Sequence, residues 1–166
     1  MKKSVRSLMG LVVALLGLSV FPGTAVSQQK SLKNSIVGSW IITSVIDRYE
    51  NGKEKNPWGA GVKGTIVFDG TGRFIQLIIG EAQPAMKTLD PRKPDALTVA
   101  YYGSYTLNEG DKSIAMKLEG ATYSARAGTK QSNTVTMKGD TMTLVGSSRK
   151  DQEGTFSPRL ELKRAK

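Results

Sequence analysis

The sequence contains no cysteine, and this absence excludes several kinds of site. Without thiols there is no disulfide, no catalytic thiolate and no lipid anchor attached through cysteine. A chain of 166 residues can bury a stable core without disulfides. The lack of cysteine therefore does not argue against export from the cytoplasm.

Histidine is also absent. Histidine is the commonest general base near neutral pH and the commonest ligand of transition metals. Its absence excludes catalytic triads built on histidine and leaves only carboxylates as ligands for zinc. We therefore expect no metal and no cofactor. Any acid–base chemistry would have to use tyrosine, arginine or carboxylates, and no carboxylate pair stands out for that work.

Long hydrophobic runs are absent, apart from Leu8–Val20 near the N-terminus. This run follows the basic stretch "MKKSVRS" and precedes small residues, which is the pattern of a signal peptide. We expect residues 1–27 to be removed by cleavage after Ser27, with cleavage after Ala25 as the alternative. The run has 13 residues, whereas a membrane-spanning helix needs about 20, so we expect no stable membrane insertion. A single N-terminal anchor is the competing interpretation.

Cleavage after Ser27 removes 27 of the 166 residues and leaves 139, which predicts one domain over residues 28–166. The three basic residues Lys2, Lys3 and Arg6 are lost with it, so the net charge falls from +10 to +7. The remaining basic residues are spread along the chain and do not interleave with aromatic residues, so we expect no nucleic-acid partner. We expect a monomer, exported to the periplasm or the extracellular space.

Turn signals divide the predicted domain into many short β-rich runs. Asp69–Gly72, Asn108–Asp111 and Lys138–Asp140 each separate two such runs, as hairpin turns do. Several runs alternate apolar and polar residues, which is typical of antiparallel strands with one buried face. About eight strands joined by sequential hairpins predict an all-β fold, either an up-and-down barrel or a sandwich.

Residues 81–101 interrupt this rhythm, because prolines stand at positions 84, 91 and 94. The segment is expected to begin as a loop, and "PDALTVAY" could form a short helix that starts at Pro94. We interpret the segment as a helical or loop lid over one end of a barrel.

Five stretches resemble the bacterial lipocalin-like domain proteins: "IVGSW", "GTIVFDGTGRFIQLI", "AYYGSYTLNEGDKSI", "MKGDTMTLVG" and "RLELKR". They occur in the order expected of that family and cover most of residues 34–164, and the first resembles the Gly-x-Trp signature of lipocalins. The resemblance implies an eight-stranded antiparallel up-and-down barrel. The chain lacks the disulfide of well-known lipocalins, and residues 81–101 stand where simple barrels keep a short loop.

The resemblance also implies a structural role for Gly-x-Trp. In lipocalins the tryptophan closes the narrow end of the barrel and packs against an arginine from the last strand. Here Arg164 shares the strand parity of Leu160 and Leu162, so it should reach the barrel floor if that face points inward. Trp40 could then form a cation–π pair with Arg164, and Gly38 would let the backbone pass close by.

An eight-stranded barrel can enclose one small ligand. Gln76 shares a strand face with apolar residues and would need a hydrogen-bond partner if buried. Tyr123 and Arg126 could hold a carboxylate or phosphate at the barrel mouth, although a solvated rim is the simpler interpretation. Trp58 could cap the pocket or pack on the outside. The inward positions that could line an apolar cavity, or simply form the core, are Phe74, Gln76, Ile78, Tyr101, Tyr105 and Met116.

Three functions fit these features. The first is an exported protein that binds a small apolar or amphipathic ligand without catalysis. The second is a barrel isomerase, cyclase or hydratase that uses tyrosine, arginine or a carboxylate inside the cavity. The third is a structural module of the cell envelope with a filled barrel. A cavity separates the first from the third, and a buried carboxylate paired with tyrosine or arginine would favour the second.

Overall fold

The computed structural model describes residues 31–82, 90, 92–93 and 96–166. The predicted signal peptide, residues 1–27, lies outside the described residues. So does most of the predicted lid between residues 83 and 95.

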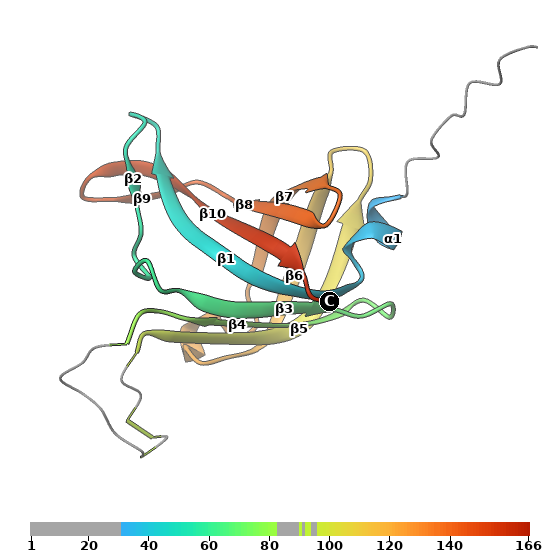
Figure 1. The fold of residues 1–166 in the computed structure, drawn as a ribbon, viewed down its shortest axis with the longest axis horizontal. Helices are drawn as coiled ribbons and strands as arrows, with labels where there is room; N and C mark the ends of the chain where they lie inside the picture. The colour runs from blue at the N-terminus through green and yellow to red at the C-terminus, as the bar shows by residue number, and fades with distance from the viewer. Residues whose placement is uncertain (1–30, 83–89, 91, 94–95) are drawn as a thin grey trace, which may run out of the picture.

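Eight long strands form a closed antiparallel barrel (Figure 1). Each strand pairs with the next barrel strand along the chain, and β1 pairs with β10 to close the ring. The strands are β1 (Gly38–Tyr49), β3 (Lys63–Phe68), β4 (Arg73–Ile79), β5 (Thr98–Asn108), β6 (Ser113–Ala121), β7 (Lys130–Lys138), β8 (Thr141–Gly146) and β10 (Gly154–Arg164). The predicted all-β, eight-stranded up-and-down barrel is therefore confirmed.

The turns between the strands follow from local chemistry. In the β3–β4 hairpin, Asp69 Oδ1 accepts hydrogen bonds from the backbone N–H groups of Thr71 and Arg73, at 2.9 and 2.8 Å. These bonds lower the pKa of the Asp69 carboxyl, with the Arg73 backbone as the largest cause. Gly72 adopts a φ of +89°, which glycine reaches without strain.

The end of the predicted lid segment belongs to the barrel wall. Residues 98–101 belong to β5 rather than to a helix, because Thr98 pairs with Ile79 and Tyr101 with Gln76 across the β4–β5 ladder. The backbone N–H of Gly80 also donates to the Leu97 carbonyl at 2.8 Å, which extends the pairing of the two chain segments. β-branched and aromatic residues in "TVAYY" favour this extended conformation.

The hydrophobic core lies inside the barrel and extends to the residues that line its cavity. Side chains alternate along each strand, so Phe74 and Ile78 of β4 point inward with Tyr101 and Tyr105 of β5. The β1 strand departs from simple alternation: Trp40 and Ile42 are buried, and so are Val45 and Tyr49. The pairing of β1 with β10 shifts between Ile42 and Ser44, and this β-bulge switches the inward positions from even to odd numbers.

A short helix, α1 (Leu32–Ile36), lies at one end of the barrel, and the sequence patterns did not predict it. The Ser31 hydroxyl accepts from the backbone N–H of Asn34, and the Glu109 carboxylate accepts from those of Leu32 and Lys33 at 2.9 Å each. These two backbone bonds lower the pKa of Glu109, with the Lys33 bond the largest cause. In the described part of the chain, no helix is long and apolar enough to cross a membrane.

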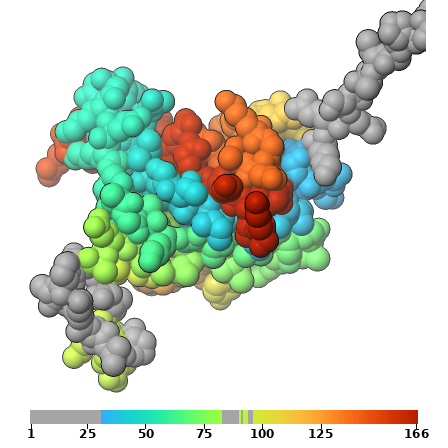
Figure 2. Space-filling model, viewed as in Figure 1, coloured from blue at the N-terminus to red at the C-terminus, as the bar shows by residue number. Residues whose placement is uncertain are grey.

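The sheet extends beyond the barrel at the other end, where β2 (Glu54–Lys55) pairs with β1 and β9 (Arg149–Asp151) pairs with β10. Figure 2 shows this extension standing out from the barrel at the end opposite α1. The buried Tyr49 ring lies 5.3 Å from that of Phe156, and its hydroxyl donates to Asp151 Oδ2 at 2.6 Å. That hydrogen bond is the main reason why the pKa of Tyr49 is raised to about 12.

Candidate functional site

A cavity of ≈ 180 Å³ lies inside the barrel, at the end that carries β2 and β9. Residues of β1, β4, β5, β7, β8 and β10 form its walls, while β9, the 3₁₀ helix η2 (Ser124–Arg126) and the loop before β3 contribute its rim. The lining residues are Val45, Asp47, Pro57, Trp58, Gln76, Ile78, Val99, Tyr101, Arg126, Gln131, Asn133, Leu144, Arg149, Phe156, Pro158 and Leu160.

Gln76 is the buried polar residue of the inner wall. Its parity with Phe74 and Ile78 on β4 points it inward, and it is only 6% exposed. Its side chain makes no hydrogen bond with any described residue, although it faces the cavity. No fully buried side-chain nitrogen or oxygen of the described residues lacks a partner, so the Gln76 amide is open to the cavity, where water or a ligand can bond to it.

Three charged side chains stand on the cavity wall: Asp47 of β1, Arg126 of η2 and Arg149 of β9. Burial raises the pKa of the half-buried Asp47 carboxyl, while the positive charge of Arg149 acts in the opposite direction. The cavity therefore combines apolar walls with charged groups, and it is less apolar than the sequence predicted.

On the side of the cavity formed by β7, two side-chain amides contact the sulfur of a buried methionine. Gln131 Nε2 and Asn133 Nδ2 approach the sulfur of Met116 at 3.6 and 3.7 Å. Met116 on β6 is fully buried behind this wall, so its sulfur holds the two amides and does not itself line the cavity.

The structure brings together four of the eight residues predicted to bind a ligand, namely Gln76, Ile78, Tyr101 and Arg126. Trp58, which could cap the pocket or pack outside, also lines the cavity, and its carbonyl accepts from the Glu81 N–H at 2.8 Å.

The other four predicted residues lie elsewhere. Phe74 and Tyr105 pack toward the closed end, where both rings contact Phe68 at centroid distances of 6.5 and 5.1 Å. Met116 is behind the wall, as described above. Tyr123 is 47% exposed beside η2, because the chain turns there and directs Arg126 rather than Tyr123 toward the cavity.

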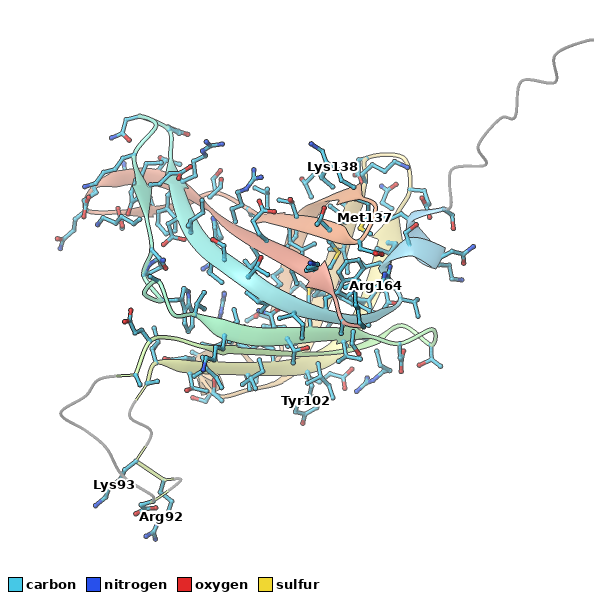
Figure 3. All side chains as sticks on the ribbon, in the orientation of Figure 1. Arg92, Lys93, Tyr102, Met137, Lys138 and Arg164 are labelled. Atoms are coloured by element: carbon cyan, nitrogen blue, oxygen red, sulfur yellow. The ribbon has the colours of Figure 1, made fainter. Side chains whose placement is uncertain are left out.

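The floor of the barrel contains the three residues predicted for it. The guanidinium carbon of Arg164 lies 4.2 Å from the centroid of the Trp40 ring, and Trp40 is fully buried. The indole N–H donates to the Ile36 carbonyl at 2.7 Å, and Arg164 donates to the Val37 and Ser35 carbonyls at 3.1 and 2.5 Å. Arg164 thus lies at the end of the barrel that carries α1 (Figure 3).

The backbone conformation at position 38 and the nearby Arg164 explain why a glycine stands there. Its φ is +129°, and a Cβ added there would lie 2.9 Å from Arg164 Nη1. A side chain at position 38 would therefore be strained by the backbone and would crowd the guanidinium that covers Trp40.

Sequence reasoning missed Asp47, Gln131, Asn133 and Arg149 as cavity residues. Asp47 points inward only because of the bulge in β1, and Arg149 reaches the cavity only because β9 folds back beside β10. The polar character of "KQSNT" in β7 was visible in the sequence, but it also fits a solvated edge. Among the described residues, no group of three or more carboxylates is placed to hold a metal ion.

Comparison with known proteins gives a match to one family and to several solved structures. The family described as "Lipocalin-like domain" matches residues 37–165. An uncharacterized protein from Bacteroides eggerthii is 16% identical, with a TM-score of 0.41, and the match covers 78% of this chain and 99% of that one. Among curated proteins, none matches the sequence.

Two further solved structures are similar at low identity. Lobster apocrustacyanin A1 is 14% identical, with a TM-score of 0.42, and the match covers 82% of this chain and 64% of that one. The siderocalin Ex-FABP is 9% identical, with a TM-score of 0.30, and the match covers 78% of this chain and 70% of that one.

Proposed function

The chain belongs to the lipocalin-like domain family, and from this premise we propose that it binds a small amphipathic molecule inside the barrel without transforming it. The observation that carries the proposal is the cavity of ≈ 180 Å³ with its mixed lining. Its inner wall supplies apolar side chains such as Ile78, Val99 and Leu144, and its rim supplies charged ones. That division matches a ligand with one apolar and one polar end.

The volume of the cavity limits the size of the ligand that it can enclose. Drug-sized ligands occupy pockets of about 300–1,000 Å³, whereas an apolar cavity of about 150 Å³ can hold benzene. A cavity of ≈ 180 Å³ fits a molecule with one ring or a short chain. The cavity also argues against the filled barrel of a purely structural module.

A binding measurement tests the proposal. The neutral single-ring probe 4-fluorobenzyl alcohol, followed by fluorine NMR, should bind the wild-type protein at one saturable site. Ile78→Trp places a large side chain in the cavity and should abolish saturable binding. The matched control is Ile75→Trp on the same strand, because Ile75 is 59% exposed and faces outward. Absence of saturable binding to the wild type, or equal binding to the two variants, would contradict the proposal.

An enzyme is the second candidate, and Asp47 is the observation that favours it. This carboxyl is half-buried in the cavity near Arg149, and its pKa is raised by burial, as a general acid or base requires. Native mass spectrometry of the purified protein would identify a bound molecule. If that molecule is returned unchanged after incubation, the protein is a carrier. If the wild type instead converts that molecule, and the Asp47→Asn variant binds it without converting it, the protein is an enzyme.

Export is part of the same proposal. We infer that residues 1–27 are a signal peptide and that the binding domain acts outside the cytoplasm. N-terminal sequencing of the protein from the producing cells should begin at Gln28, or at Val26 if cleavage follows Ala25. An intact Met1 on membrane-bound protein would establish an anchor instead.

A further inference from the structure

We propose that the molecule held in the cavity is a small monocarboxylate, with its carboxylate bound by Arg126 and Arg149 and its apolar part against the inner wall. This inference rests on the proposed function and names the ligand class. It follows from the charges around the cavity, from their partners within the protein and from the polar group left inside.

The charges that line the cavity do not balance. Arg126 and Arg149 contribute two positive charges and Asp47 contributes one negative charge. Asp47 lies within electrostatic reach of Arg149, and also of Asp151 and Lys55. Arg126 is half-buried, and its guanidinium forms no ion pair or hydrogen bond with the described residues. The guanidinium of Arg126 on the cavity wall is therefore free to pair with an anion.

The neighbouring carboxylates of the extension, Asp151 and Glu153, make their contacts with residues other than Arg126. Asp151 accepts the hydrogen bond of the Tyr49 hydroxyl at 2.6 Å, and Glu153 forms ion pairs with Lys53 and Lys55. Neither Asp151 nor Glu153 forms an ion pair with Arg126, so the guanidinium of Arg126 keeps no carboxylate partner among the described residues. An anionic ligand would supply that partner.

Carboxylate fits this site better than phosphate. The excess over the cavity lining is one positive charge, whereas a phosphate monoester carries about −1.5 to −2 at neutral pH. Guanidinium groups also match the two oxygens of a carboxylate with paired hydrogen bonds. The overall charge of +10, or +7 without the first 27 residues, would favour the approach of any anion.

The inner wall supplies a second, independent observation. Gln76 is 6% exposed, faces the cavity and has no hydrogen-bond partner among the described residues. An amide of this kind fits a ligand with polar atoms within the cavity and not a pure hydrocarbon. A small carboxylate, with its accompanying water, can satisfy it, while Ile78 and Leu144 contact the apolar part.

The test compares 4-fluorophenylacetate with its neutral isostere 4-fluorophenylacetamide by fluorine NMR at fixed ionic strength. The wild type should bind the carboxylate about tenfold more tightly or better, the range expected for charge-assisted hydrogen bonds. The double variant Arg126→Gln/Arg149→Gln should lose this preference and still bind the amide. Lys150→Gln is the matched control, because it removes a positive charge from an exposed neighbour on β9 that does not line the cavity. It should keep the preference.

Each outcome is decisive for the inference. Equal affinity of the wild type for the carboxylate and the amide would overturn the monocarboxylate and leave the binding function intact. A preference that survives in the double variant, or that disappears equally in Lys150→Gln, would overturn the placement at the two arginines. If neither compound binds while 4-fluorobenzyl alcohol does, the anion class is wrong and the proposed function stands. If none of the three probes binds, the proposed function fails with it.

Discussion

Removal of Trp40 and Arg164, singly and together, tests the closed end of the barrel. Trp40 is fully buried, its indole N–H donates to the Ile36 carbonyl, and its ring lies 4.2 Å from the Arg164 guanidinium. Arg164 also donates to two carbonyls at the end of α1, those of Ser35 and Val37. Both side chains therefore hold the helix against the barrel, and each depends on the position of the other.

The expected magnitudes follow from this geometry. Trp40→Ala should lower the free energy of unfolding by about 3–5 kcal/mol, the usual range for a buried large aromatic residue. Arg164→Ala should cost less, because its side chain is 32% exposed and water can replace part of its contacts. The coupling between the two changes should be about 1–2 kcal/mol, since the cation–π pair is partly desolvated and the two residues share the helix end.

Urea unfolding of the wild type, both single variants and the double variant measures this coupling. A second cycle with Arg48→Ala provides the control, because Arg48 lies eight residues further along β1. At about 3.3 Å per residue the two positions are about 26 Å apart, so those changes should add within about 0.5 kcal/mol. If the Trp40 and Arg164 changes also add within about 0.5 kcal/mol, the two side chains do not support each other and the cation–π coupling is refuted.

Three further predictions concern the backbone and the titrating groups. Gly38→Ala should lower the free energy of unfolding by about 1–3 kcal/mol, because its φ of +129° is strained for alanine; an unchanged urea midpoint would contradict this. Glu109 has a pKa below its ordinary value of 4.5, so it stabilises the fold above that pH and loses this effect as the pH falls through its lowered pKa. The Glu109→Gln variant should therefore lose less stability on acidification below pH 4.5 than the wild type, and parallel acid-unfolding curves would rule this out. Asp151→Asn should lower the pKa of Tyr49 from about 12 toward 10, and tyrosinate absorbance checks it: a titration identical to that of the wild type would show that Asp151 is not the cause.

The architecture could be predicted from the sequence because it rests on local signals. The Asp-Gly-Thr-Gly turn between β3 and β4 depends on hydrogen bonds within five residues, from Asp69 to Arg73. Alternation of apolar and polar residues marks the buried face of each strand, whatever the strand pairs with. Family resemblance then decided between a barrel and a sandwich, which alternation alone could not do.

The sequence also located the floor, since parity along β10 places Arg164 on the same face as Leu162 and the bulge in β1 comes only after Trp40. Tyr105 and Phe74 face inward as their parity predicts, but they pack around Phe68 and do not line the cavity. Parity says which face a residue occupies, whereas its depth along the barrel axis depends on the tilt and register of all eight strands.

Tertiary structure alone determines which charged residues line the open end of the cavity. Asp47 turns inward because one extra residue in β1 reverses its alternation, and Pro158 is tolerated in β10 because it lies between the segments paired with β9 and with β8. Arg126 and Arg149 come from segments with no periodic pattern, and both line the cavity because η2 and the β9–β10 hairpin border it. Periodicity is a property of single strands and can be read from a sequence. The charges at the mouth are brought together by contacts between segments far apart in the chain, and only the closed barrel fixes those contacts.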